Sequence, residues 1–81
     1  MRIRLLLFAL YRDLTGVDEL VVDVPDGSSA GAALRALRER DARFARLPER
    51  PVVAINREYA LLDESLHEDD ELALLPPVAG G

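Results

Sequence analysis

The chain has 81 residues, of which 49% are hydrophobic and 31% are charged, and its formal net charge is −5. This length and composition predict one small folded domain and exclude a disordered chain. The absence of Cys excludes a disulfide scaffold and a thiolate metal site. The acidic balance argues against nucleic-acid binding. No segment is long and apolar enough to span a membrane, so we expect a cytoplasmic protein.

The first third of the sequence predicts two strands. Residues 2–9 alternate as a strand does, and a short helical turn is expected at 11–14, stopped by Gly16. Residues 18–24 form the second strand, which ends at the Pro-Asp-Gly turn at 25–27. One face of each strand is apolar: Ile3, Leu5 and Leu7 in the first, and Leu20, Val22 and Val24 in the second.

The middle of the sequence predicts one amphipathic helix. Ser28 or Ser29 can cap its N-terminus. Its apolar stripe follows the i, i+3, i+4, i+7 spacing of one helix face: Ala30, Ala33, Leu34 and Leu37. Residues 42–50 are expected to be a loop that is anchored by Phe44 and Leu47.

The last third predicts a hairpin, a loop and a final strand. Residues 51–55 and 59–62 are expected to be strands joined by a tight turn at 56–57, where Asn tolerates a positive φ. An acidic loop at 63–71 precedes the last strand, 72–75. The order of two strands, a helix and three strands predicts an α+β fold, with the helix packed across one face of the sheet.

The other face of that sheet is expected to be partly apolar. In the first strand, Leu6 and Phe8 lie opposite the core-facing residues, and in the last strand Ala73 and Leu75 lie opposite Leu72 and Leu74. A contiguous exposed apolar patch usually marks an interface. The alternative is that residues 40–50 fold over this face and bury it.

The chain ends in Pro-Pro-Val-Ala-Gly-Gly, which divides it into a domain, 1–75, and an extended, flexible tail, 76–81. The prolines stiffen the exit from the last strand, and the two glycines leave the carboxylate of Gly81 without shielding side chains. The alternative is a frayed terminus without a function. Six extended residues span up to about 20 Å.

Few other groups in the sequence can do chemistry. His67 is the single His, and the acidic loop lacks the ligand spacing of a calcium-binding loop, so no metal site is expected. No nucleophile stands beside a general base in a recognisable motif. If the chain takes part in a reaction, the reacting group is therefore the carboxylate of Gly81, and whether the chain is itself an enzyme stays open.

The sequence resembles the small subunits of molybdopterin synthase, a family of ubiquitin-like β-grasp sulfur carriers. The resemblance covers the whole chain and is carried by residues 7–16, 54–59 and 70–81, above all by the Pro-Pro-Val-x-Gly-Gly ending. Leu75 departs from the aromatic residue of some relatives, and Asp69 stands where relatives often place Gly.

The resemblance implies a β-grasp fold with a mixed sheet of about five strands, and a mechanism. An E1-like adenylyltransferase would use ATP to adenylate Gly81, and sulfur transfer would yield a thiocarboxylate. The large synthase subunit, in a heterotetramer of two small and two large subunits, would then pass this sulfur to cyclic pyranopterin monophosphate. The small subunit itself would bind no cofactor.

The same resemblance implies roles for particular residues. The tail that enters the large subunit would be Pro76, Pro77, Val78, Ala79, Gly80 and Gly81, and the docking residues would be Phe8, Tyr59 and Leu75. Three alternatives remain open at this point. The chain could carry sulfur for thiamine, cysteine or transfer-RNA thiolation, act as a ubiquitin-like modifier through Gly81, or be an interaction module with an inert tail.

Overall fold

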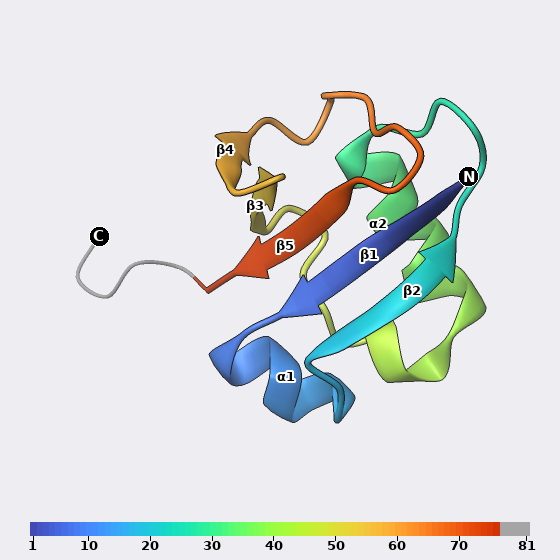
Figure 1. Cartoon of the computed structure of the whole chain (residues 1–81). Helices are drawn as coiled ribbons and strands as arrows, with labels where there is room; N and C mark the ends of the chain where they lie inside the picture. Colours follow the sequence, from blue (N-terminus) through green and yellow to red (C-terminus); the bar gives the residue numbers. More distant parts are fainter. Residues whose placement is uncertain (77–81) are drawn as a thin grey trace.

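The computed structural model describes residues 1–76, which form a five-stranded sheet and two α-helices (Figure 1). The strands are β1 (Arg2–Leu7), β2 (Glu19–Asp23), β3 (Val52–Ile55), β4 (Glu58–Ala60) and β5 (Glu71–Leu75). The helices are α1 (Ala9–Thr15), α2 (Ala30–Arg40) and the short 3-10 helix η1 (Ala42–Phe44).

The sheet is mixed, with the strand order β2-β1-β5-β3-β4. β1 and β5 run parallel, and the other neighbouring pairs are antiparallel. The last strand therefore lies in the middle of the sheet, beside the first. Because the two strands run in the same direction and Leu7 pairs with Leu74, their carboxyl ends leave the sheet side by side.

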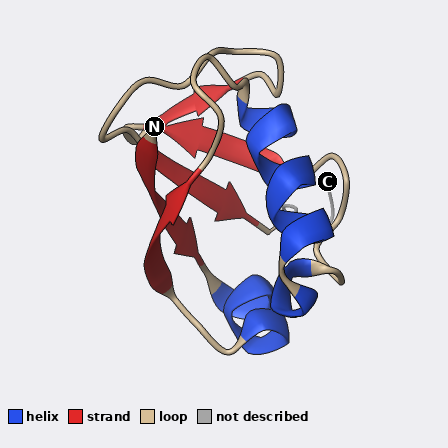
Figure 2. Ribbon diagram, turned by 90° about the vertical axis from the view of Figure 1, so that its right-hand side faces the viewer, coloured by secondary structure: helices blue, strands red, loops and turns tan. Residues whose placement is uncertain are grey.

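The core lies between the sheet and α2, which covers one face of the sheet (Figure 2). The residues predicted for the inner face of β1 are 0–1% exposed, as are Leu72 and Leu74 of β5. All four residues of the helix stripe are buried as well. Burying one such Leu side chain stabilises the fold by about 1.5–3 kcal/mol. The sheet and α2 therefore pack through the faces that carry these apolar side chains.

The N-terminus of α2 is fixed by Ser29 and Gly31. The Oγ atom of Ser29 accepts a hydrogen bond from the backbone N–H of Ala32 at 3.1 Å, so Ser29 is the cap. The N–H of Gly31 donates to the carbonyl of Leu62 at 2.7 Å. A Cβ atom at position 31 would lie 3.2 Å from that carbonyl oxygen. Glycine lowers helix propensity here, but it permits this close approach between α2 and the segment after β4.

The structure refines the predicted boundaries at the end of the first strand. β1 ends at Leu7, and α1 replaces the expected turn at 11–14 with a helix of 7 residues. The helix ends where expected, because Gly16 adopts the left-handed conformation with a φ of 79°. Residues 5–9 are all apolar, so no change in the sequence pattern marks this boundary.

Two later segments also differ from the prediction. The return strand is Glu58–Ala60, not 59–62, and the loop 42–50 contains η1. The predicted anchors Phe44 and Leu47 are 1% and 3% exposed and belong to the same core cluster as α2. The alternative that residues 40–50 bury the outer face of the sheet is therefore wrong.

Candidate functional site

A row of small and apolar side chains crosses the outer face of the sheet. Leu6 pairs with Ala73, Ala73 with Ala54, and Ala54 with Tyr59, so one residue from each of β1, β5, β3 and β4 lies in line. The two central members are alanines, and larger side chains stand around them. The result is a hollow of about 430 Å³, which we call the outer hollow.

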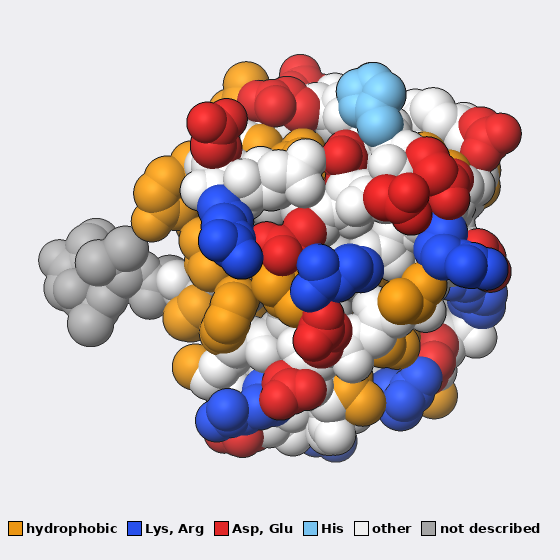
Figure 3. Space-filling view, viewed as in Figure 1, with side chains coloured by type: hydrophobic (Ala, Val, Ile, Leu, Met, Phe, Trp, Pro, Cys, Tyr) orange, Lys and Arg blue, Asp and Glu red, His pale blue; other side chains and the backbone are white. Residues whose placement is uncertain are grey.

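The outer hollow brings the three predicted docking residues together. Phe8 is 44% exposed and Tyr59 is 79% exposed, while Leu75 is partly buried. The complete lining is Leu6, Phe8, Ala54, Arg57, Tyr59, Glu71, Ala73 and Leu75. Figure 3 shows hydrophobic side chains gathered on this face, with acidic and basic side chains at their border. The arrangement is typical of an interface, but the binding role of the three residues stays a prediction.

The lining of the outer hollow could be predicted only in part from the sequence. Strand parity had already placed Leu6 and Ala73 on this face. Ala54 and Arg57 were missed as site residues, although the predicted hairpin at 51–62 contains both. Ala54 is two residues after Val52 and therefore lies on the same face of β3, and Val52 is 46% exposed. This spacing could have placed Ala54 on the outer face, but the sequence does not show that β3 lies beside β5.

A hydrogen-bond network holds the β3–β4 turn against the start of β5. Asn56 and Arg57 have φ angles of 51° and 72°, as a two-residue hairpin turn with two positive φ angles requires. The Asn56 side chain donates to Asp70 Oδ1 at 2.9 Å and accepts from the backbone N–H of Glu71 at 3.0 Å. Asp70 Oδ2 accepts from the backbone N–H of His67 at 2.8 Å. This network fixes one wall of the outer hollow.

Asp70 makes this network sensitive to acid. Burial alone would raise the pKa of the Asp70 carboxyl, but hydrogen bonds from Asn56 and His67 outweigh burial and hold the pKa below its usual value. A carboxyl with a lowered pKa in the folded state stabilises the protein above its unfolded-state pKa, and this stability is lost as the pH falls through the folded-state pKa.

We therefore expect Asp70→Asn to lower the free energy of unfolding at pH 7 by about 1–3 kcal/mol, because an amide NH₂ would face the existing donors. The substitution should also flatten the loss of stability below about pH 4. Urea unfolding at pH 7 and pH 3 measures both effects. Asp63→Asn is the matched control, because the exposed Asp63 side chain makes no hydrogen bond within residues 1–76. Equal pH profiles for the two variants would contradict the assignment.

The structure places the start of the tail at the outer hollow. β5 ends at Leu75, which lines the hollow, and Pro76 is the last residue that the structure describes. The other predicted tail residues, Pro77, Val78, Ala79, Gly80 and Gly81, lie outside the described residues. A partner that docks in the hollow would therefore sit beside the point where the tail begins.

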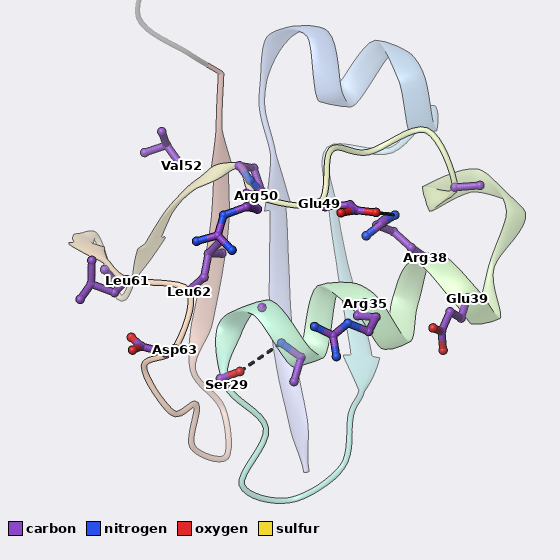
Figure 4. Close-up of a pocket in the computed structure, with 15 residues that line it drawn as sticks. Ser29, Arg35, Arg38, Glu39, Glu49, Arg50, Val52, Leu61, Leu62 and Asp63 are labelled. Atoms are coloured by element: carbon purple, nitrogen blue, oxygen red, sulfur yellow. Dashed lines mark hydrogen bonds and ion pairs between the residues drawn. The ribbon is translucent and has the colours of Figure 1, made fainter.

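A second, larger groove of about 1000 Å³ lies between α2 and the β3–β4 hairpin (Figure 4). It holds three arginines and three acidic residues: Arg35, Arg38, Arg50, Glu39, Glu49 and Asp63. Arg38 reaches Glu49 at 3.5 Å and so connects α2 to the segment before β3. Its Nε atom is buried without a hydrogen-bond partner in the described part of the chain. None of the predicted site residues lines this groove, and its charges balance one another.

Two further observations limit the chemistry of residues 1–76. No group of three or more His, Asp or Glu side chains in this range could hold a metal ion. None of the helices described combines the length and the apolar character that a membrane crossing requires. The described residues that were predicted to form a site are thus those of the outer hollow and Pro76.

A mixed five-stranded sheet, with α2 across one face and the last strand at its centre, defines the class of ubiquitin-like β-grasp proteins. Within this class, the chain belongs to the ThiS family, whose family model matches residues 5–81. The fold and the family predicted from the sequence are both confirmed.

Three known proteins illustrate the relationship. The molybdopterin synthase sulfur carrier subunit of Arabidopsis thaliana is 37% identical over 79 residues, which cover 98% of this chain and 82% of that protein. Small archaeal modifier protein 3 of Haloferax volcanii is 33% identical over 92 residues, with both chains covered completely. The crystal structure of SAMP1 from Haloferax volcanii superposes with a TM-score of 0.81 at 32% identity, and again both chains are covered completely.

Proposed function

We propose that this chain is the sulfur-carrier subunit of a molybdopterin synthase and that Gly81 carries the sulfur. The observation that carries the proposal is the position of the outer hollow, where Leu75 ends the central strand at the start of the tail. The family match extends to residue 81, so it includes the Gly-Gly ending. The whole-length similarity to the Arabidopsis thaliana carrier subunit supports sulfur as the cargo.

The proposed reaction has two stages. An E1-like enzyme joins the Gly81 carboxylate to the AMP part of ATP and releases pyrophosphate. A sulfide-level nucleophile such as hydrosulfide then attacks the acyl carbon, the bond from that carbon to the phosphate oxygen breaks, AMP leaves, and the acyl group keeps the sulfur as a thiocarboxylate. In the second stage the large synthase subunit, which supplies the catalytic side chains, moves this sulfur to cyclic pyranopterin monophosphate. Water returns the Gly81 acyl group to a carboxylate, and a second thiocarboxylate supplies the other sulfur of the dithiolene. Adenylation is needed because a free carboxylate is a poor acyl donor, whereas AMP is a good leaving group.

The outer hollow would serve both stages by docking each partner in turn. Phe8, Tyr59 and Leu75 provide the apolar contacts, and the tail, at about 3.3 Å per extended residue, reaches up to about 20 Å into the partner. Docking raises the local concentration of the tail at the partner's active site. Two carriers and two large subunits would form a heterotetramer in the cytoplasm, and this chain would bind no cofactor of its own.

Mass spectrometry tests the first stage directly. The intact chain is incubated with its cognate E1-like enzyme, ATP and a sulfur donor. Its mass should rise by the difference between one sulfur and one oxygen atom, with the change confined to the C-terminal peptide. A reaction without ATP is the control, because it cannot form the acyl-adenylate. An unchanged mass in the complete reaction would refute the proposal.

A second function, protein modification, is favoured by the whole-length similarity to small archaeal modifier protein 3. In that case the activated Gly81 would form isopeptide bonds with lysines of other proteins. The chain contains no Lys, so it could not receive its own tail on a lysine side chain. The last site of tryptic cleavage in the chain is Arg57, so tryptic digests of cells that express the chain would show lysines of other proteins linked to the peptide of residues 58–81, which the sulfur-carrier function alone does not produce.

A further inference from the structure

We infer that Arg57 orients the large synthase subunit in the outer hollow, by pairing with a carboxylate at the rim of that subunit's docking surface. The inference rests on the proposed function, because it takes the outer hollow as the docking site. It adds a charged residue to the apolar contacts of Phe8, Tyr59 and Leu75, and it specifies the chemistry of the partner.

The backbone of Arg57 is the first observation. Arg57 is the second residue of the β3–β4 turn, and its φ of 72° is in the left-handed region, which costs a residue other than Gly about 1–2 kcal/mol. The side chain of Asn56, the other residue of the turn, forms hydrogen bonds with Asp70 and Glu71. These hydrogen bonds account for the presence of Asn at this position. The Arg57 side chain makes no hydrogen bond or ion pair with any residue from 1 to 76. Its strain is therefore not offset by a polar contact within the described domain.

The charges around the outer hollow are the second observation. Of the residues that line it, Arg57 and Glu71 are charged. The Glu71 side chain is 12% exposed and faces Arg4 at 3.7 Å, and Arg4 is also paired with Glu19. Glu71 is thus already compensated, whereas Arg57 is exposed and leaves an unpaired positive charge at the rim.

This charge stands out because the chain as a whole has a net charge of −5. A positive rim in an acidic protein favours a partner with a carboxylate opposite position 57 and disfavours one with a basic group there. A guanidinium can also pair with a carboxylate through two parallel hydrogen bonds, which adds orientation to the attraction. Arg57 would then determine the orientation of the partner, while Phe8, Tyr59 and Leu75 provide most of the affinity.

The test uses the full chain and the purified large synthase subunit of the same organism. The dissociation constant and its salt dependence are measured for Arg57→Gly, Arg57→Lys and Arg57→Glu, together with the thermal unfolding of each variant. Arg57→Gly should weaken binding about tenfold at low salt and reduce the salt dependence. Arg57→Lys should stay within about threefold of the wild type, and Arg57→Glu should weaken binding about a hundredfold, because a repulsion replaces the attraction.

Thermal unfolding separates a docking role from a structural one. Arg57→Gly should unfold at a higher temperature than the wild type, because Gly adopts the left-handed conformation without strain. A variant that binds less well and is nevertheless more stable cannot owe its defect to a damaged fold. Arg46→Glu, on an exposed residue that does not line the outer hollow, makes the same change in net charge as Arg57→Glu and should bind normally.

Either of two results would overturn the inference: wild-type binding by Arg57→Gly at every salt concentration, or a lower stability of that variant. Phe8→Asp, measured in the same series, distinguishes this failure from that of the proposed function. If Phe8→Asp loses binding and Arg57→Gly does not, the outer hollow docks the partner without help from Arg57. If the wild-type chain does not bind the large subunit, the proposed function itself fails.

Discussion

Deletion of Gly81 is expected to abolish sulfur transfer and to leave the folded domain unchanged. The deletion moves the terminal carboxylate back by about 3.3 Å. A displacement of about 1 Å can already lower a rate a hundredfold, so we expect at least that loss at both stages. The core should not respond, because every residue of the core cluster lies between Ile3 and Leu74. Synthase turnover with purified large subunit and thermal unfolding measure the two effects.

A chain with one Ala appended after Gly81 is the matched control for this deletion. It keeps a carboxylate but moves it outward by about the same distance, so activation should fail while docking stays intact. Binding of both variants to the large subunit should be close to wild type, because the docking surface is unchanged. Synthase activity that survives the deletion of Gly81 would show that sulfur transfer does not require the carboxylate to stand at position 81.

Phe8→Asp is expected to weaken docking by about 2–4 kcal/mol, as the loss of an aromatic residue from the centre of an interface does. A buried aspartate would also lose its hydration without gaining a partner in the apolar part of the hollow. The domain should remain folded, since the Phe8 side chain is already 44% exposed. Calorimetric titration with the large subunit gives the affinity, and circular dichroism monitors the fold.

Two neighbouring substitutions make this prediction specific. Leu61→Asp introduces the same charge at a residue that is 67% exposed and lines the second groove, so its docking should be normal. Leu7→Asp alters the residue next to Phe8, but the Leu7 side chain is 1% exposed, and this variant should unfold. Unfolding of Phe8→Asp itself would mean that Phe8 belongs to the core and that the docking assignment is mistaken.

The faces of the strands could be predicted from the sequence because alternation is a local property. Leu5 and Leu72 point into the core and Leu6 and Ala73 point away from it, as their parity requires. The apolar stripe of α2 and the turn at Asn56 were likewise local signals, and the structure confirms both. For the same reason, Phe8 and Leu75 could be assigned to one surface before the strand order was known.

The remaining features depend on contacts between distant segments. The outer hollow exists because β5 lies between β1 and β3, an order that the sequence does not encode locally. Asp70 holds the β3–β4 turn through a hydrogen bond that it accepts from Asn56, which is 14 residues away in the sequence. α1 begins at Ala9, whose φ of 47° follows from the way the chain turns after β1 and not from the propensity of Ala. Such features become visible only when the whole sheet is assembled.

The central position of β5 also bears on the synthesis of the protein. β5 is the last strand to leave the ribosome, yet both of its edges pair with strands made earlier. A nascent chain without β5 cannot join β1 to β3, and it also lacks Ala73 and Leu75 of the outer hollow. Since domains generally fold as units during translation, a truncated product without β5 would lack the complete outer hollow. The topology thereby couples the formation of the outer hollow to the synthesis of the last strand of the sheet.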